Sequence, residues 1–217
     1  MTTQRGKYIV IEGNEGSGKT TQCEVIKKWL RQVMQLSAIA VREPGGDPFG
    51  EALREVIKNP AFEHAADEEL LVFTAARMGM RRRKVVPALE SGQWVISDRS
   101  ELSTFVYQGF GGHLDLSEIA QTQQKVAEIC RPDLFILLKI SPEVSQARLK
   151  QRNEAPDSFE SRDTAYQQRI SDGYSVVGAY AREIGYVVID IDGNQPQVMV
   201  TEAIKDIIVN QFFRPVD

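Results

Sequence analysis

The chain has 217 residues, of which 42% are hydrophobic and 26% are charged. This composition is typical of a folded globular protein and excludes collagen-like, coiled-coil and disordered chains. The formal net charge of -4 provides no general attraction for nucleic acid or for an anionic membrane, so any phosphate binding must depend on local clusters.

Five short apolar runs predict β-strands, and they begin at Lys7, Ala38, Gln93, Asp133 and Tyr186. Strands that read as continuous apolar runs are buried on both faces of a sheet. The segments between them have helical spacing and span residues 18–36, 49–91, 116–131, 141–152 and 162–184, with a further helix after Pro196. This alternation predicts one α/β domain over residues 1–217, with a five-stranded parallel sheet and helices on both faces.

Two further features concern the cell compartment and flexibility. Cys23 and Cys130 lie far apart without the spacing of a zinc site, which predicts buried, reduced thiols. No apolar segment is long enough for a signal peptide or a membrane span, so we expect a cytoplasmic protein with no membrane partner. Residues 151–161, QRNEAPDSFES, interrupt two predicted helices with charge, proline and small polar residues. We expect a mobile lid at about residues 148–162.

The first predicted strand leads into GNEGSGKT, which matches the P-loop pattern G-x-x-x-x-G-K-S/T between a strand and a helix. In such a loop, backbone N–H groups turn toward phosphate oxygens, Lys19 adds a point charge, and Thr20 offers a hydroxyl to Mg²⁺. The ATP site is therefore expected to contain Gly13, Asn14, Glu15, Gly16, Ser17, Gly18, Lys19, Thr20 and Thr21.

A carboxylate for Mg²⁺ is expected at the end of a neighbouring strand, and WVISDRS supplies Asp98 there. An Asp-Arg pair after a strand is also typical of a helix cap beside a surface charge. Its combination with the P-loop favours the metal site, formed by Thr20 and Asp98. An Asn-Lys-x-Asp signature is missing from the sequence, which disfavours a GTPase.

Three more stretches follow the P-loop: REPGG at 42–46, FTAAR at 73–77 and DRSELSTFVYQG at 98–109. Their combination resembles the bacterial-type thymidylate kinases, which are P-loop nucleoside monophosphate kinases, from Lys7 to about Pro196. The resemblance implies the three-layer α/β sandwich of P-loop NTPases and transfer of the γ-phosphoryl group of ATP to dTMP, with Mg²⁺ as cofactor. It also implies ATP and dTMP as partners, no nucleic acid, and a homodimer.

Phe73 and Arg77 are four residues apart, so one helix face carries a ring that can stack on a base and a guanidinium that can donate to an exocyclic oxygen. The resemblance assigns Phe73 to stacking on thymine and Arg77 to the O4 oxygen, which would exclude cytosine. Leu70 and Phe73 could instead form an ordinary buried stripe. The charge of Arg77 on that stripe requires a partner.

Other positions match the family's acceptor site. Arg42 and Arg99 match arginines that hold the acceptor phosphate, which a guanidinium can bind bidentately, although pairing with surface carboxylates is the alternative. The resemblance places Pro44 against the base, Thr104 near thymine N3, and Tyr107 where a ribose 2′-hydroxyl would clash; Tyr107 could also be a packing residue. The expected dTMP site is Glu15, Arg42, Pro44, Phe73, Arg77, Arg99, Thr104, Tyr107 and Gln108.

The P-loop region carries two carboxylates, Glu12 and Glu15. A carboxylate inside the loop would repel ATP, so we expect Glu15 to point toward the acceptor and to accept a hydrogen bond from a sugar hydroxyl. The resemblance assigns this acid to the 3′-hydroxyl of dTMP. For Glu12 two interpretations stay open: it orders the site or a metal-bound water, or it is a partly buried acid bonded to nearby backbone.

Gly16 stands where the eukaryote-like branch of the family has a P-loop arginine. We therefore expect the catalytic groups to be Lys19 and Arg99 together with Arg148 and Arg152, which lie one helical turn apart. A solvated, charged helix end is the alternative for the last two.

The sequence departs from the family at two places. The family's lid pattern Asp-Arg-x-Glu reads Asp157-Ser158-Phe159-Glu160 and so lacks its arginine, and Gly112 stands where related bacterial sequences often carry Arg. Two alternative functions therefore stay open. A deoxynucleoside kinase shares the P-loop but takes an uncharged acceptor, and a degenerate nucleotide-binding protein would have no catalytic activity.

Two more segments are assigned on pattern. Residues 81–84, RRRK, suggest a nucleic-acid patch, but the net charge and the lack of interleaved aromatics favour a solvated helix face or a rim around the acceptor phosphate. Residues 192–196, DGNQP, match the family loop that lines the donor adenine.

Overall fold

The computed structural model describes residues 4–59, 61–152, 158–159 and 161–214. Its sheet has five strands: β1 (Tyr8–Gly13), β2 (Ala38–Arg42), β3 (Trp94–Asp98), β4 (Leu134–Lys139) and β5 (Val188–Asp192). The strand order is β2-β3-β1-β4-β5, and every neighbouring pair is parallel. The predicted five-stranded parallel sheet is confirmed.

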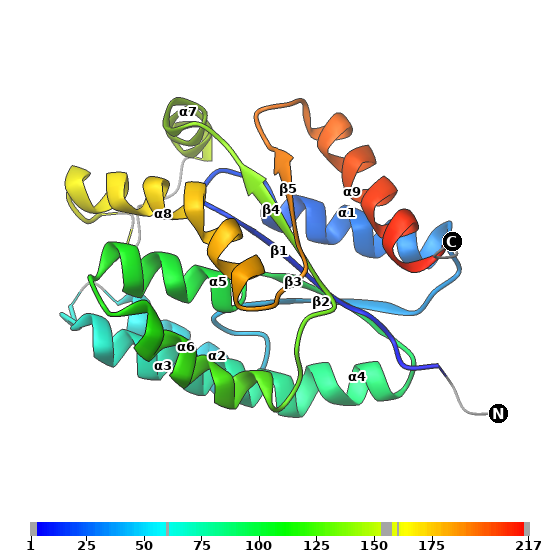
Figure 1. Cartoon of the computed structure of the whole chain (residues 1–217), viewed down its shortest axis with the longest axis horizontal. Helices are drawn as coiled ribbons and strands as arrows, with labels where there is room; N and C mark the ends of the chain where they lie inside the picture. Colours follow the sequence, from blue (N-terminus) through cyan, green and yellow to red (C-terminus); the bar gives the residue numbers. More distant parts are fainter. Residues whose placement is uncertain (1–3, 60, 153–157, 160, 215–217) are drawn as a thin grey trace.

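The helices form two layers around this sheet (Figure 1). They are α1 (Lys19–Gln32), α2 (Pro48–Lys58), α3 (Ala66–Met80), α4 (Val86–Glu90), α5 (Glu101–Thr104), α6 (Leu116–Ala127), α7 (Pro142–Arg152), α8 (Thr164–Glu183) and α9 (Gln197–Phe212). Two π-helical segments, η1 (Arg81–Val85) and η2 (Phe105–Gly111), continue α3 and α5. In Figure 1, α1 and α9 lie on one side of the sheet and α2 to α6 on the other. Within the described residues, no helix is both long and apolar enough to cross a membrane.

Alternating residues of the strands build two separate cores. Tyr8 and Val10 of β1 belong to the cluster that packs on α3, α6 and α8, whereas Ile9 and Ile11 belong to the cluster under α1 and α9. All four side chains are fully buried. The sheet is therefore covered on both faces, which is why its strands read as continuous apolar runs.

Two helical assignments differ from the sequence prediction. The segment 49–91 contains a break, because α2 ends at Lys58 and α3 begins at Ala66. Asn59, which precedes Pro60, has an extended backbone with ψ 116°, as expected for a residue before proline. Residues 101–111, for which no helix was predicted, form α5 and η2. Their sequence, ELSTFVYQGFG, contains two glycines, two β-branched residues and three aromatic residues and has low helical propensity.

The topology brings the motifs to one edge of the sheet. The P-loop follows β1, the REPGG motif begins at the last residue of β2, and Arg99 follows β3. In the register of the sheet, Asp98 lies beside Ile11 on one side and beside Arg42 on the other. Ligands of parallel α/β sheets bind at the carboxyl ends of the strands, where the connections diverge to opposite sides. The central strand β1, between β3 and β4, is such a point.

Candidate active site

The P-loop joins the end of β1 to the start of α1. Gly16 and Gly18 adopt left-handed φ angles of 75° and 91°, which let successive N–H groups turn inward. Lys19 is buried, and its Nζ donates to the carbonyl oxygen of Asn14 at 2.9 Å. Burial and the nearby guanidinium of Arg99 lower the pKa of Lys19, so an anion bound in the loop would favour its charged form.

Gly16 has a local reason to lack a side chain. A Cβ atom there would lie 3.0 Å from the carbonyl oxygen of Ser145 and 3.4 Å from Cβ of Arg148, both on α7. The left-handed backbone adds strain for any residue other than glycine. An arginine at this position of the loop is therefore disfavoured by the packing of α7.

Thr20 and Asp98 meet at the base of the loop, where the Thr20 hydroxyl donates to the Asp98 carboxylate. Mg²⁺ in nucleotide sites is usually held by one or two protein oxygens together with phosphate oxygens. This pair fits that pattern, because it offers one hydroxyl and one carboxylate beside the phosphate loop. Among the described residues, no group of three or more His, Cys, Asp or Glu side chains forms a metal site of its own.

Arg99 lies at the centre of the site. It is a non-glycine residue with a left-handed φ of 74°, a strained conformation that is most often found at functional positions. Its guanidinium pairs with Glu15 and donates to Ser103 at 3.0 Å and to the hydroxyl of Tyr174 at 2.7 Å. It also lies 5.3 Å from the centre of the Tyr107 ring. Glu15 therefore points out of the P-loop, as its charge predicts, and its partner is Arg99.

Glu12 combines both roles that its sequence position left open, because it is a buried acid bonded to backbone and it also orders a segment of the site. It is fully buried and accepts hydrogen bonds from the backbone N–H groups of Ser100 and Ser103 at 2.7 and 3.1 Å and from the Ser103 hydroxyl at 2.8 Å. Burial raises the pKa of Glu12 above its ordinary value, although Arg99 and these hydrogen bonds oppose the shift. Glu12 therefore anchors the segment that follows β3.

A cavity of about 330 Å³ opens beside the P-loop. It brings together all nine predicted acceptor residues, as well as Lys19, Thr20 and Asp98. Six further lining residues were not predicted: Glu43, Arg54, Lys58, Ser100, Ser103 and Phe159. The cavity is large enough for a small ligand such as a mononucleotide.

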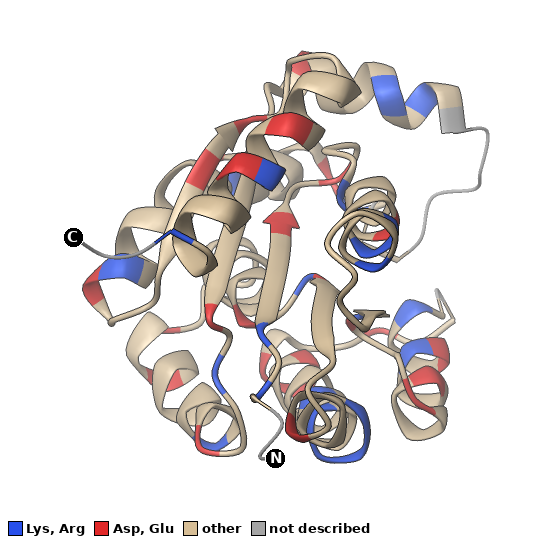
Figure 2. Cartoon of the chain, turned by 90° about the vertical axis from the view of Figure 1, so that its right-hand side faces the viewer, with Lys and Arg blue, Asp and Glu red and all other residues tan. Residues whose placement is uncertain are grey.

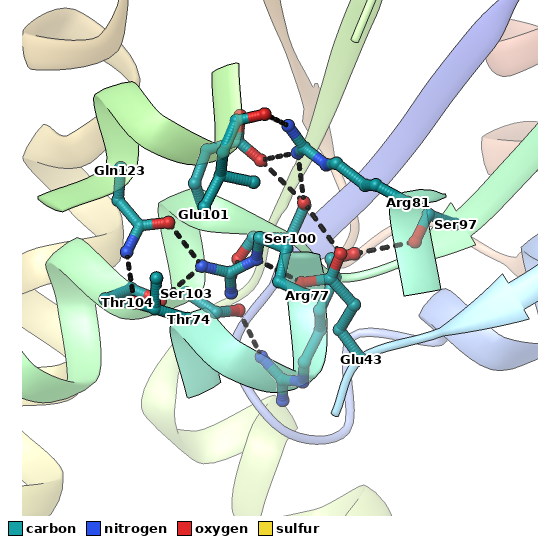
Figure 3. Close-up of polar contacts among 12 residues, drawn as sticks. Glu43, Thr74, Arg77, Arg81, Ser97, Ser100, Glu101, Ser103, Thr104 and Gln123 are labelled. Atoms are coloured by element: carbon teal, nitrogen blue, oxygen red, sulfur yellow. Dashed lines mark hydrogen bonds and ion pairs between the residues drawn. The ribbon is translucent and has the colours of Figure 1, made fainter. Parts of the chain in front are cut away.

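Arg77 is buried in the wall of this cavity, with only 3% of its surface exposed. It pairs with Glu43 and donates to Thr104 at 3.0 Å, to the side-chain oxygen of Gln123, and to the carbonyl oxygen of Ser100 at 3.1 Å (Figure 3). Burial raises the pKa of Glu43, and the guanidiniums of Arg77 and Arg81 oppose that rise. Arg77 thus has the partner that a charge on this helix stripe requires.

Three aromatic rings, those of Phe73, Tyr107 and Phe159, line the cavity, and Phe159 belongs to the predicted lid. Phe73 is partly buried, and its ring centre lies 5.8 Å from that of Phe159, which in turn lies 5.9 Å from the ring of Tyr107. Gln108 also lines the cavity, but its amide nitrogen donates to the buried Glu69 at 2.9 Å. Glu69 is paired with Arg162 at the start of the region that leads into α8.

The REPGG loop is held by charged side chains of α2. Arg42 pairs with Glu51 at 2.9 Å, and Glu51 also accepts from the backbone of Gly46 at 2.9 Å. Arg54 donates to the carbonyl oxygen of Pro44 at 2.9 Å. Arg42 is more than half exposed, so its pairing leaves it accessible to a second anion.

Arg148 of α7 connects the P-loop with the loop after β5. Its guanidinium donates to the carbonyl oxygens of Gly16 at 3.2 Å and Gly193 at 3.0 Å. A groove of about 260 Å³ next to this second loop is lined by Lys139, Ile140, Asp190, Ile191, Asp192 and Asn194. Asp192 and Asn194 belong to the segment predicted to line adenine, and Asn194 donates to Asp192 at 3.0 Å.

Part of the predicted lid lies outside the described residues. Asp157 and Glu160 of the lid pattern are among these, and the side chain of Arg152, at the end of α7, is not described. Ser158, which replaces the family arginine, donates to the carbonyl oxygen of Ile57 at 3.2 Å. Gly112 is tightly packed, because a Cβ atom there would lie 2.5 Å from Cβ of Ala66. An arginine at this position has no room in this arrangement.

The interpretation of residues 81–84 as a solvated face, or as a rim around the acceptor phosphate, is wrong for Arg81. This side chain is fully buried and pairs with Glu101, and none of the four residues lines the cavity. Arg82 and Lys84 are exposed, and the half-exposed Arg83 pairs with Asp47. Figure 2 shows Lys and Arg interspersed with Asp and Glu over the visible helices, consistent with the mixed composition.

Sequence reasoning missed several partners of the predicted residues. Glu43 lies inside the REPGG motif, so a search for a carboxylate to neutralise Arg77 could have found it. Gln123 and Tyr174 come from α6 and α8, and nothing in their local sequence distinguishes them from other polar residues. Their contribution depends on the tertiary fold.

Comparisons with known proteins agree with this geometry. The family model described as thymidylate kinase matches residues 11–203. The thymidylate kinase of Legionella pneumophila (strain Corby) is 39% identical over 210 residues, which cover 96% of each chain. That of Carboxydothermus hydrogenoformans is 38% identical over 186 residues, 86% of this chain and 89% of the relative. A crystal structure of thymidylate kinase from Ehrlichia chaffeensis matches with a TM-score of 0.73 and 26% identity, covering 94% of this chain and 99% of that one.

Proposed function

The chain belongs to the thymidylate kinase family and is an ATP-dependent nucleoside monophosphate kinase that converts dTMP to dTDP; we propose that the cavity of about 330 Å³ is its dTMP site and that the P-loop holds the phosphates of ATP. The family assignment argues against the deoxynucleoside kinase and against the non-catalytic protein. What remains to be assigned is the role of each residue.

One observation supports the acceptor assignment most strongly. A guanidinium has five N–H donors, and in the described part of the chain four hydrogen bonds of Arg77 engage Nε, both protons of Nη1 and one of Nη2. One Nη2 proton is left for a ligand. Arg77 can only donate, so it favours the O4 oxygen of thymine and opposes the amino group that cytosine carries at the same position.

The remaining acceptor residues have complementary roles in this proposal. Arg42 and Arg99 hold the phosphate of dTMP, and Phe73 stacks on thymine. Glu15, already fixed by its pair with Arg99, accepts from the 3′-hydroxyl of the sugar. Pro44, Thr104 and Gln108 border the base, and Tyr107 borders the sugar where a 2′-hydroxyl would lie, as in the family.

Phosphoryl transfer needs positioning and charge stabilisation rather than a covalent intermediate. Lys19 and the N–H groups of the P-loop would hold the β- and γ-phosphates. Thr20 and Asp98 would hold Mg²⁺, which neutralises phosphate charge when it is bound. Arg148 and Arg152 would stabilise charge on the migrating group, since the loop itself has no arginine.

A ligand panel tests the acceptor assignment. Binding and phosphorylation of dTMP should be compared with those of 5-methyl-dCMP, which has the same sugar, phosphate and methyl group but an amino group in place of O4. We expect dTMP to be preferred by at least about tenfold in kcat/KM, because the wrong base leaves the buried Arg77 donor opposed by another donor. Equal kcat/KM values for the two nucleotides would contradict the assignment of Arg77.

We also propose that the chain acts as a single cytoplasmic domain whose lid spans about residues 148–162, and that it assembles as a homodimer. These proposals rest on the resemblance to the family. Sedimentation equilibrium of the whole chain at micromolar concentration would show about twice the monomer mass of 24.4 kDa if the dimer forms, and the monomer mass would contradict it.

A further inference from the structure

The basic run Arg81–Lys84 in η1 has one buried member followed by three exposed ones. Arg81 is fully buried, Arg82 and Lys84 are exposed, and Arg83 is half exposed and pairs with Asp47, the N-cap residue of α2. A fully buried guanidinium cannot contact a nucleic acid or the substrate directly, so any role of Arg81 in the reaction must pass through its neighbours.

The contacts of Arg81 join three elements. Its Nη1 donates to the carbonyl oxygens of Val126, at 3.3 Å, and Cys130 at the end of the α6 region, and its Nη2 pairs with Glu101 and donates to the Ser100 hydroxyl at 3.0 Å. Burial alone would raise the pKa of Glu101, but Arg81 and Arg77 outweigh it and hold the pKa below its ordinary value. Glu101 is therefore a carboxylate that depends on Arg81.

Ser100 is the junction between this ion pair and the acceptor site (Figure 3). Its backbone N–H donates to Glu12, its carbonyl oxygen accepts from Nη2 of Arg77 at 3.1 Å, and its hydroxyl contacts Glu43 at 3.1 Å and Glu101 at 2.6 Å. It directly follows Arg99, the strained arginine proposed for the acceptor phosphate. A shift of Ser100 would therefore move both arginines that face dTMP.

The cost of burial argues against a purely stabilising role for this pair. Taking two charges out of water is unfavourable, and well-packed apolar residues often replace a buried ion pair with no loss of stability. An ion pair whose two side chains are 0% and 1% exposed is therefore a weak stabiliser unless it fixes one particular arrangement. Here the arrangement that it fixes is the segment carrying Arg99 and Ser100.

We propose that Arg81 is a positioning residue for the acceptor: through Glu101 and Ser100 it holds Arg77 and Arg99 in the geometry that binds dTMP. The inference rests on the acceptor site proposed above. It assigns a function to part of the basic run that belongs to neither a nucleic-acid surface nor the cavity wall. Loss of the pair should weaken dTMP binding and leave ATP binding unchanged.

The test replaces both charges by apolar residues, in the double variant Arg81→Met/Glu101→Leu, so that no uncompensated charge is left in the core. We expect a melting temperature close to that of the wild type, a KM for dTMP raised about tenfold, and a KM for ATP within twofold of the wild type. The preference for dTMP over 5-methyl-dCMP should also fall. A folded double variant with unchanged KM for dTMP would overturn the proposal.

Three further variants keep the result interpretable. Ser100→Ala removes only the junction hydroxyl, so it tests the same path if the double variant does not fold; a raised KM for dTMP supports the proposal, and an unchanged value overturns it. Arg82→Met, at the next and exposed position, should leave both KM values unchanged. Arg99→Ala tells a failure of this proposal from a failure of the acceptor site on which it rests. If Arg99→Ala also leaves the KM for dTMP unchanged, the acceptor site itself is wrongly assigned. If Arg99→Ala raises that KM but the double variant and Ser100→Ala do not, only the role of Arg81 is overturned.

Discussion

The acceptor side and the donor side of the site are built in different ways. Around the acceptor cavity, two buried ion pairs, Arg77–Glu43 and Arg81–Glu101, share Ser100 and draw partners from α3, α5 and α6. On the donor side, the P-loop offers mainly backbone groups, and Asp190 in the groove near the loop after β5 pairs with Lys139 and Arg182, whose side chains, like that of Asp190, are 30–43% exposed. One side is a cross-linked polar core, and the other is a loop beside an open groove.

This difference matches what each side must recognise. A base is distinguished by a few hydrogen bonds, which discriminate strongly only when the donors are buried and fixed. A triphosphate is held mainly by its negative charge, which does not require donors fixed in one orientation. Backbone N–H groups, one lysine and a cation therefore suffice to bind it. We therefore expect a substitution on the acceptor side to change the binding of dTMP by shifting several residues at once. A substitution on the donor side should change only the binding of ATP and the rate of phosphoryl transfer.

The largest effect is expected from Lys19→Met, which removes the buried charge of the P-loop. The methionine keeps the length of the side chain but cannot donate to the phosphates, so kcat should fall by about 10²- to 10³-fold. The dissociation constant of dTMP, measured by calorimetry without ATP, should stay within about twofold. A comparable loss of dTMP affinity would show that the two sides are not separate.

The next effect in size is expected from Arg77→Gln on the acceptor side. Hydrogen bonds to a charged group are worth about 1.5–3 kcal/mol, so the KM for dTMP should rise by about ten- to a hundredfold and that for ATP should not change. The variant also leaves Glu43 without its partner in the core, so the melting temperature should fall. The double variant Arg77→Gln/Glu43→Gln removes that unpaired charge.

This double variant separates folding from recognition. It should regain part of the lost melting temperature, yet its preference for dTMP over 5-methyl-dCMP should stay low, because a glutamine can both donate and accept. If dTMP preference returns together with stability, Arg77 is a structural residue and does not read the base.

The sequence predicts those features of the two sides whose residues are close together along the chain. The P-loop, REPGG and Asp98-Arg99 occupy short stretches at the ends of apolar runs, and parallel strands bring such stretches to one edge. Their meeting in one cavity could therefore be predicted. The contacts of the P-loop are made largely by its own backbone, which also makes them readable from local sequence.

The cross-links of the acceptor side could not be read in this way. Arg81 lies four residues after Arg77 and so shares its helix face, but its place in a run of four basic residues predicts a solvated face. Its partner Glu101 lies in a segment for which no helix was predicted, so nothing in the local sequence points to the pair. Gln123 and Tyr174 reach the site from distant helices, so only the tertiary structure identifies them.

A smaller effect, confined to the donor side, is expected from Arg148→Ala. The side chain joins the carbonyl oxygens of Gly16 and Gly193, so its loss should loosen the P-loop from the loop after β5 and raise the KM for ATP by about tenfold. The KM for dTMP should not change. If Arg148 also stabilises the migrating phosphoryl group, kcat falls as well, and Arg148→Lys, which keeps the charge, should recover part of that loss. If both the KM for ATP and kcat stay unchanged, Arg148 has no role in the site and its charge only solvates the end of α7.

The smallest expected effect comes from Glu51→Gln, at the exposed margin of the acceptor side. The hydrogen bond from the Gly46 backbone, followed by Arg42, lowers the pKa of Glu51 in the folded chain despite some desolvation. A carboxyl with a lowered folded-state pKa stabilises the fold above its unfolded pKa of about 4.3, and that contribution disappears as the pH falls through the folded-state pKa.

The free energy of unfolding of Glu51→Gln should therefore lie below that of the wild type at pH 7, by less than about 1 kcal/mol since the pair with Arg42 is exposed, and the two curves should converge in acid. Denaturant unfolding at a series of pH values measures this difference. Glu55→Gln removes the same charge from the same helix but not the contacts to Arg42 and Gly46, so it controls for net charge. If the difference between wild type and Glu51→Gln persists unchanged below the folded-state pKa, the carboxylate charge is not what holds the REPGG loop, and the cross-linked character of the acceptor side ends at its buried core.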